Sequence, residues 1–151
     1  MAFNVLFVCT GNTCRSPMAE GLLKSRLPAE KRGSFSIASA GTATAKGLPV
    51  SLEAAEVMRE LGIDISRHLS RPLTAALADD ADLILTLERS HLGQIADHFP
   101  SARGKAYLLS LYADKKGAGD DVPDPAGQDL IAYRQARDQI LRYIERIAEK
   151  I

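Results

Sequence analysis

The sequence predicts an α/β fold: a doubly wound, four-stranded parallel sheet with helices on both faces, formed by one domain that spans residues 1–151. Two observations lead to this prediction. Short apolar runs alternate with longer amphipathic segments, which is the pattern of repeated strand–helix–strand units. The chain has 151 residues, of which 46% are hydrophobic, and this is enough for one ordinary domain with its own core.

Apolar runs mark the expected strands. The first run, residues 5–8, is continuously apolar, as a strand covered on both faces should be. The later runs are bounded by turn-forming and helical segments, which is typical of strands joined by crossover helices. The expected strands are residues 5–8, 34–38, 82–87 and 105–109.

Apolar residues at helical spacing mark the expected helices. The second helix should end at Gly62, because glycine readily takes the left-handed conformation that closes a helix. The last helix has the most regular pattern, carried by Leu130, Tyr133, Ile140, Leu141, Ile144, Ile147 and Ile151. The expected helices are residues 18–27, 52–61, 89–98 and 130–151. Residues 114–128, rich in Gly, Asp and Pro, are expected to form a long functional or mobile loop.

Residues 9–15 join the first expected strand to the first expected helix. A loop at this position presents backbone N–H groups and the positive end of a helix dipole to an anion, and the same field favours the thiolate form of a cysteine. Arg15 adds a fork of donors suited to phosphate oxygens. Gly11 and Asn12 tolerate positive φ, which a tight anion-binding loop demands. We therefore expect this loop to hold a phosphate against Cys9.

These residues also allow two simpler interpretations. Cys9 could be an inert buried thiol at a strand end, with Arg15 as an exposed partner in a surface ion pair. The two cysteines could also belong to a metal site, but the spacing of the three histidines matches no zinc pattern. We expect no metal and no cofactor, because Arg15 and the loop amides supply the positive charge that phosphate requires.

The run Val8-Cys9-Thr10-Gly11-Asn12-Thr13-Cys14-Arg15-Ser16-Pro17 resembles the signature of the low-molecular-weight protein tyrosine phosphatases. A second motif of that family, an Asp-Pro loop near the C-terminus, is matched by Val122-Pro123-Asp124-Pro125. The resemblance covers nearly the whole chain. It implies the flavodoxin-like strand order 2-1-3-4 and a low-molecular-weight phosphatase domain over residues 1–151.

The resemblance also implies a catalytic role for three residues. Cys9 would attack phosphorus and form a phosphocysteine intermediate, while Arg15 would bind phosphate oxygens and stabilise the transition state. Asp124 would be the general acid, held between Pro123 and Pro125, with Asp120 and Asp121 as competitors for this role. The remaining residues expected to bind the substrate are Thr10, Gly11, Asn12, Thr13 and Cys14.

Three further residues, Ser16, Ser39 and His68, are expected to support the loop, and Cys14 is expected to protect it. Asn12 would take a left-handed conformation and be linked by hydrogen bonds to Ser16, Ser39 and His68, as the resemblance implies. Ser16 could also cap the first helix, with Pro17 at its first position. Cys14 would be a resolving thiol that forms a reversible disulfide with oxidised Cys9.

Substrate choice depends on a few positions. Tyrosine-directed members of the family usually carry a branched aliphatic residue where this chain has Thr13, and aromatic residues where it has Ala126-Gly127. The threonine, and the later run Tyr133-Arg134-Gln135-Ala136-Arg137-Asp138, resemble the bacterial protein-arginine phosphatase branch, although that branch often has Phe-Gly-Gly after Asp-Pro. We therefore expect phosphoarginine as the substrate, with phosphotyrosine as the alternative. An arsenate reductase and a non-catalytic phosphate-binding module are the less favoured interpretations.

Charge and composition limit the partners. Lys plus Arg and Asp plus Glu number 19 each, so no nucleic-acid-binding surface is expected. No stretch approaches the ~20 apolar residues of a membrane helix, and the first residues do not resemble a signal peptide. With two cysteines and no disulfide framework, we expect a cytoplasmic monomer that acts on phosphorylated proteins.

Overall fold

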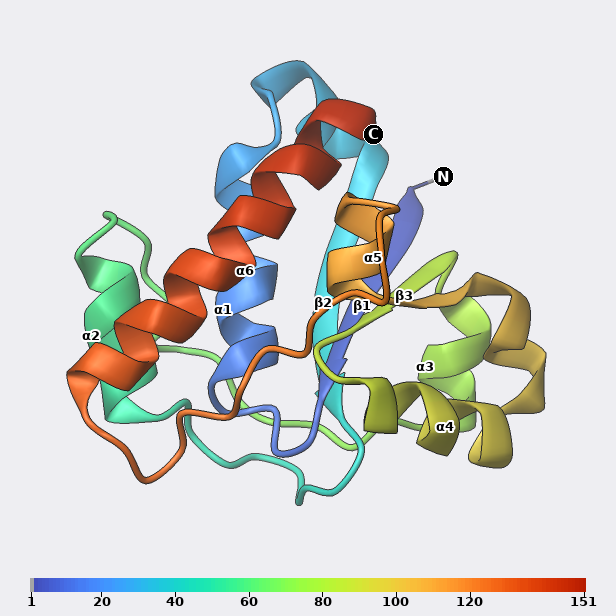
Figure 1. The fold of residues 1–151 in the computed structure, drawn as a ribbon, viewed down its shortest axis with the longest axis horizontal. Coiled ribbons are helices and arrows are strands. Elements are labelled where there is room, and N and C mark those ends of the chain that lie inside the picture. The colour runs from blue at the N-terminus through green and yellow to red at the C-terminus, as the bar shows by residue number, and fades with distance from the viewer. Residues whose placement is uncertain (1) are drawn as a thin grey trace.

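The computed structural model describes residues 2–151. Four strands form one parallel sheet in the order β2-β1-β3-β4, as Figure 1 shows. Both the fold class and the strand order predicted from the sequence are confirmed. The strands are β1 Phe3–Cys9, β2 Phe35–Gly41, β3 Leu83–Thr86 and β4 Ala106–Leu108.

Helices cover both faces of the sheet (Figure 1). The α-helices are α1 Arg15–Arg26, α2 Leu52–Arg59, α3 Ala75–Asp80, α4 Arg89–His98, α5 Leu109–Ala113 and α6 Leu130–Lys150. Two short 3₁₀ segments, η1 Ala29–Ser34 and η2 Pro100–Lys105, precede β2 and β4. Among residues 2–151, no helix is long and apolar enough to cross a membrane.

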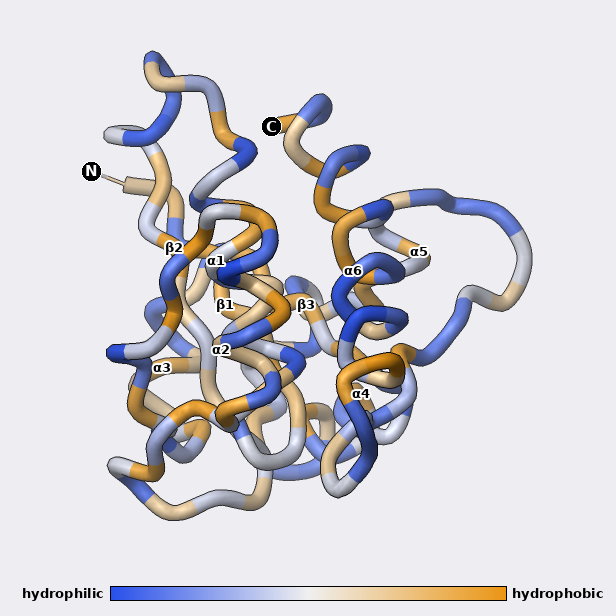
Figure 2. The backbone as a smooth tube through the Cα atoms, turned by 90° about the vertical axis from the view of Figure 1, so that its left-hand side faces the viewer, coloured by the Kyte–Doolittle hydropathy of each residue, from blue (hydrophilic) through white to orange (hydrophobic). Residues whose placement is uncertain are grey.

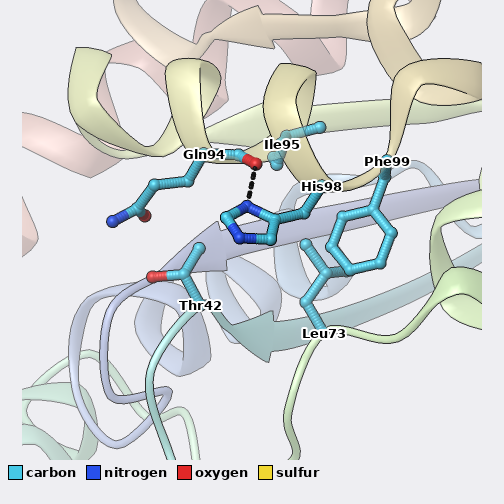
Figure 3. Close-up of a pocket in the computed structure, with 6 residues that line it drawn as sticks. All are labelled: Thr42, Leu73, Gln94, Ile95, His98 and Phe99. Carbon is cyan, nitrogen blue, oxygen red and sulfur yellow. Dashed lines mark hydrogen bonds between the residues drawn. The ribbon is translucent and has the colours of Figure 1, made fainter.

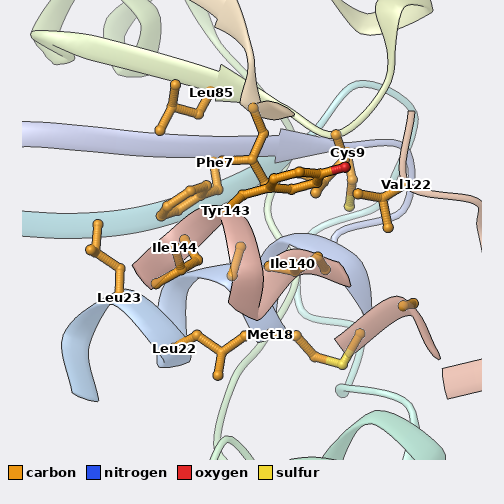
Figure 4. Close-up of a cluster of buried hydrophobic side chains, with 14 of the residues drawn as sticks. Phe7, Cys9, Met18, Leu22, Leu23, Leu85, Val122, Ile140, Tyr143 and Ile144 are labelled. Carbon is orange, nitrogen blue, oxygen red and sulfur yellow. The ribbon is translucent and has the colours of Figure 1, made fainter. Parts of the chain in front are cut away.

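Strand β1 divides the core because its side chains alternate between the two faces of the sheet. Phe7 and Cys9 point into a large cluster with side chains from α1, α2, α5 and α6, part of which is drawn in Figure 4. Leu6 and Val8 point into a smaller cluster with side chains from α3, α4 and η2. Burial of one such large apolar side chain contributes roughly 1.5–3 kcal/mol, so this central strand is held rigidly from both sides.

Several predicted boundaries were wrong by a few residues. Helix α1 begins at Arg15 rather than residue 18, and α2 ends at Arg59, although Gly62 does take a left-handed φ of 75° shortly after it. The predicted fourth strand included Leu109, which instead begins α5. The sequence analysis did not predict α3, α5 or the 3₁₀ segments, because segments of five or six residues are too short to show a clear periodicity.

The segment between α5 and α6 has neither helix nor strand, in agreement with the predicted long loop at residues 114–128. Figure 2 shows its first part as a hydrophilic arc that leaves the body of the protein after α5. Val122, in contrast, is fully buried, and its N–H donates to the carbonyl of Leu87 just beyond β3. This contact brings the segment back to the carboxyl edge of the sheet, where ligands of open α/β sheets bind.

Candidate active site

Cys9 ends β1 and is 1% exposed. The backbone N–H of Asn12 donates to its Sγ at 3.3 Å, and the hydroxyl of Ser16 lies 2.9 Å from the same atom. These two polar contacts hold the sulfur at the position where the sequence predicted the nucleophile.

Asn12 braces the loop. It is fully buried, with a left-handed φ of 56°. Its side-chain Nδ2 donates to Ser16 at 2.8 Å and to Ser39 at 3.0 Å, while its Oδ1 accepts the backbone N–H of Arg71 at 3.0 Å. His68 Nε2 lies 2.9 Å from the backbone oxygen of Asn12. The structure thus joins Asn12 to Ser16, Ser39 and His68 as expected, although His68 contacts the backbone and not the side-chain amide.

Two expectations about this loop were wrong. Ser16 does not cap α1: it lies inside the helix, and its buried hydroxyl is taken up by Cys9 and Asn12. Cys14 occupies the N-cap position of α1, and its side chain makes no capping hydrogen bond. No capping side chain therefore competes with an anion for the N–H groups of the first helical turn. Gly11 does not have a positive φ, because Asn12 provides the left-handed turn.

Gly41 allows β2 to run beside the loop. A Cβ built at this residue would lie 2.5 Å from the backbone oxygen of Thr10, which no side chain could tolerate. The next two residues continue the close approach, since the N–H groups of Thr42 and Ala43 donate to the carbonyls of Cys9 and Thr10. The backbone of the loop is therefore held on this side by glycine-dependent packing.

Arg15 is 1% exposed although it carries a full charge. Its Nη1 donates to the carbonyl of Val122 at 2.8 Å and lies 3.4 Å from Glu88 Oε1, and its Nη2 lies 3.8 Å from Asp124 Oδ2. Among the described residues, the buried Nε of Arg15 has no hydrogen-bond partner. An anion bound in the loop would supply that missing acceptor.

The structure separates the three candidate acids. Asp124 lies at the mouth of the loop, with its Oδ1 3.7 Å from Cys14 Sγ and its side chain 46% exposed. Asp121 is engaged elsewhere, because its Oδ1 accepts the backbone N–H of Arg89 at 2.9 Å. Asp120 is fixed through its backbone N–H, which donates to Ser110. Of the three, Asp124 has the contacts to the loop that an acid needs.

Cys14 has surroundings unlike those of Cys9. Burial raises the pKa of its thiol from 9.0 to about 12, and the nearby Cys9 and Asp124 add to the increase. Cys14 is therefore a neutral thiol near neutral pH, and both cysteines are free. The loop holds one sulfur among donors and the other in a setting that opposes ionisation.

Four site residues were missed by the sequence analysis. Glu20 accepts the hydroxyl of Ser39 at 2.7 Å, and Arg71 meets Asn12 and the carbonyl of Ser39. Glu88 and His91 reach the loop from the start of α4. No spacing in the sequence connects these residues with the loop, because each meets it through tertiary packing.

A cavity of about 270 Å³ lies close to the loop but takes none of its lining from residues 9–15. Figure 3 shows it between α4 and the segment that follows β2, with Leu73, Ile95 and Phe99 as its apolar walls. His98 also lines it, and its Nδ1 is 2.9 Å from the carbonyl oxygen of Gln94 in the same helix. The cavity is thus a neighbour of the anion-binding loop and not a part of it.

The arrangement combines a sulfur that can attack, a loop with uncapped N–H groups, a buried guanidinium and a carboxylate at one mouth. These are the parts that transfer of a phosphoryl group to a cysteine requires. Among residues 2–151, no cluster of three or more His, Cys, Asp or Glu side chains could hold a metal ion.

Comparisons with known proteins agree with this chemistry. The family model described as low molecular weight phosphotyrosine protein phosphatase matches residues 4–151. A protein-arginine-phosphatase of Geobacillus stearothermophilus is 38% identical over 152 residues, covering 100% of this chain and 97% of that protein. The low molecular weight protein-tyrosine-phosphatase Etp of Escherichia coli K12 is 34% identical, with 100% and 97% covered.

A solved structure is also similar. It is the YwlE arginine phosphatase whose cysteine was replaced by serine and whose active-site serine is phosphorylated. Its TM-score is 0.90 at 36% sequence identity, covering 97% of this chain and 94% of that one. The match therefore covers nearly the whole chain.

Proposed function

Because this chain is a protein phosphatase that belongs to the low molecular weight phosphotyrosine protein phosphatase family, we propose that it hydrolyses phosphoarginine in proteins, with Cys9, Arg15 and Asp124 as its catalytic residues. The catalytic part of the proposal rests on one observation: Asn12 N–H and Ser16 Oγ lie within 3.3 Å of the Cys9 sulfur, and Arg15 and Asp124 meet at the same mouth. A serine at the active site of the similar arginine phosphatase carries phosphate, which also fits a nucleophile in the loop.

In the first step, the Cys9 thiolate attacks phosphorus while the bond from phosphorus to the leaving nitrogen breaks. The loop N–H groups and Arg15 stabilise the equatorial oxygens of the transition state. Asp124 gives its proton to the leaving nitrogen, so that arginine departs as a neutral guanidine and takes up a further proton from water. The product of this step is a phosphocysteine.

In the second step, water attacks the phosphocysteine. Asp124, now a carboxylate, accepts a proton from that water as the phosphorus–sulfur bond breaks. Inorganic phosphate leaves and the Cys9 thiolate is restored, with Asn12 and Ser16 again donating to its sulfur. No residue ends the cycle in a changed state.

Thr13 carries the proposal of phosphoarginine. It is half-buried, and its hydroxyl lies 3.6 Å from where a Cβ of Gly11 would be. A hydroxyl can accept a hydrogen bond from a guanidinium group, whereas a branched aliphatic side chain suits the face of an aromatic ring. Tyr133 does not supply a free stacking surface, because it is 3% exposed.

Phosphotyrosine is the second candidate substrate. It is favoured by the similarity to the tyrosine phosphatase Etp, which spans this whole chain. Rates on phosphoarginine and phosphotyrosine peptides of one sequence, measured side by side, test the choice. We expect kcat/KM to be higher on the phosphoarginine peptide, and a preference for phosphotyrosine would contradict the proposal.

We also propose that Cys14 protects Cys9 in a reducing cytoplasm. Hydrogen peroxide would oxidise the Cys9 thiolate to a sulfenic acid, and Cys14 would attack that sulfur to form a disulfide and release water. Oxidation also removes the negative charge of Cys9, one of the causes that hold Cys14 protonated. Mass spectrometry after peroxide treatment should find one internal disulfide, and overoxidised Cys9 without a disulfide would contradict this role.

A further inference from the structure

His91 is a buried titratable residue that the mechanism above does not use. It lies in the first turn of α4 and is 1% exposed. Its Nε2 is 2.9 Å from the hydroxyl of Thr10, the residue that follows Cys9 in the chain. The sequence separation of 81 residues means that packing alone created this contact.

Glu88 extends the contact to the other end of the loop. Its Oε2 lies 3.4 Å from His91 Nε2, and its Oε1 lies 3.4 Å from Arg15 Nη1. Thr10, His91, Glu88 and Arg15 therefore form one chain of polar contacts. This chain ties the start and the end of the phosphate-binding loop to α4.

The position of the proton on His91 follows from its surroundings. Burial and the positive charge of Arg15 lower its pKa, so the ring is neutral near neutral pH. Nδ1 is buried and has no partner among the described residues. A buried N–H without an acceptor is rarer than an acceptor without a donor, so the proton belongs on Nε2. His91 then donates to the oxygen of Thr10, and the hydroxyl hydrogen of Thr10 points elsewhere.

We propose that His91 is a positioning residue for phosphoryl transfer: it fixes the Thr10 side chain and, with Glu88, holds the loop that carries Cys9 in its reactive shape. The inference rests on the proposed function, because it concerns the loop in which Cys9 acts. His91 has no role of its own in proton transfer here. It acts through Thr10, so the two residues should behave as one unit.

A double-mutant cycle tests this coupling. His91→Phe keeps a ring of similar size but removes the hydrogen bond, and Thr10→Val keeps the shape of threonine without its hydroxyl. Each change should lower kcat on an aryl phosphate by about tenfold with little change in KM, as expected for a contact that matters in the transition state. The double variant should be no slower than the slower single variant.

Conservative variants complete the test. His91→Gln retains an N–H donor and Thr10→Ser retains the hydroxyl, so both should recover most of the activity. His98→Phe is the matched control, because His98 lies in the same helix and bonds to its own helix backbone. This control should leave kcat unchanged.

A purely structural role for His91 predicts a different result. Melting temperature would then fall in His91→Phe without a rate loss in the folded protein, or the rate losses of the two single variants would multiply in the double variant. Either outcome would overturn the proposal. If His91→Phe does not fold, equal kcat values for Thr10→Val and Thr10→Ser would overturn it as well. An active Cys9→Ser protein would instead refute the proposed function, so the two failures are distinguishable.

Discussion

The loop at residues 9–15 and the segment at residues 114–129 meet at the same mouth but are built in different ways. The loop is short, lies between a strand and a helix, and buries Cys9, Asn12 and Arg15. The segment is long, mostly exposed and without regular structure. The placement of Cys9 and its loop is therefore a product of local chain geometry, whereas the placement of Asp124 depends on how a distant segment is anchored.

The anchors of the segment are few and specific. Both backbone groups of Val122 are hydrogen-bonded: its N–H donates to the carbonyl of Leu87, and its carbonyl accepts a hydrogen bond from the Arg15 guanidinium. Arg89 holds the part just before it, through Asp121 and the carbonyls of Ala118 and Gly119. Asp124 comes two residues after the Val122 anchor, which is close enough for its place to be set while its side chain stays accessible.

The largest effect should come from the loop. Cys9→Ser should abolish turnover, because a serine hydroxyl lacks the acidity that lets the loop donors stabilise an anion. The measurement is steady-state hydrolysis of an aryl phosphate, with circular dichroism to show that the fold is kept. Substantial turnover by the folded variant would show that Cys9 is not the nucleophile. The comparison of the loop at residues 9–15 with the segment at residues 114–129 would then lose its basis.

A substitution in the segment at residues 114–129 should lower kcat by less, and the size of the loss should depend on the leaving group of the substrate. Asp124→Asn should lower kcat by ~10²–10⁴-fold on a phosphopeptide, the range typical of a lost general acid, and by less on an activated aryl phosphate that needs little protonation. Asp121→Asn is the matched control, because it removes the same charge from a carboxylate that accepts the backbone N–H of Arg89. If Asp121→Asn were impaired and Asp124→Asn behaved like the wild type, the acid would be assigned to the wrong residue.

The reactivity of Cys14 depends on both regions, because Cys14 lies in the loop and its Sγ is 3.7 Å from Oδ1 of Asp124 in the segment. Burial is the largest cause of the raised pKa of Cys14, and it remains in Cys9→Ser protein, so iodoacetamide should label Cys14 more slowly in the folded variant at pH 8 than in urea. Adding Asp124→Asn removes one of the causes of the raised pKa and should speed the labelling. Equal rates in the folded and unfolded protein would show that Cys14 is not protected.

The smallest effect concerns specificity. Thr13→Ile removes a hydrogen-bonding group and reshapes the wall of the site, a change of ~1–3 kcal/mol in transition-state binding. The ratio of kcat/KM for phosphoarginine over phosphotyrosine should fall about tenfold or more. Thr13→Ser, which keeps the hydroxyl, is the control and should keep the ratio. An unchanged ratio in an active Thr13→Ile protein would mean that the substrate is chosen elsewhere.

Sequence reasoning succeeded where chemistry depends on neighbours in the chain. The strand–loop–helix order, the left-handed Asn12 and the long segment around Asp124 all depend on local residue types or local periodicity. It was right that Ser16 bonds to Asn12 but wrong that Ser16 could also cap the helix, because a cap is the simplest local role for a serine before proline. The groups that bind the Ser16 hydroxyl instead, Cys9 Sγ and Asn12 Nδ2, come within reach only when the chain has folded into the loop.

By itself, the sequence determined the fold class, the strand order through its family resemblance, and the strand–loop–helix order that places Cys9 and Arg15 at the two ends of one short loop. The tertiary structure decided which groups surround that loop. Glu20, Arg71, Glu88 and His91 reach it from α1, the segment after α2 and the start of α4. Their contacts follow from the packing of helices on a sheet, and packing joins residues whose separation along the chain carries no periodic signal.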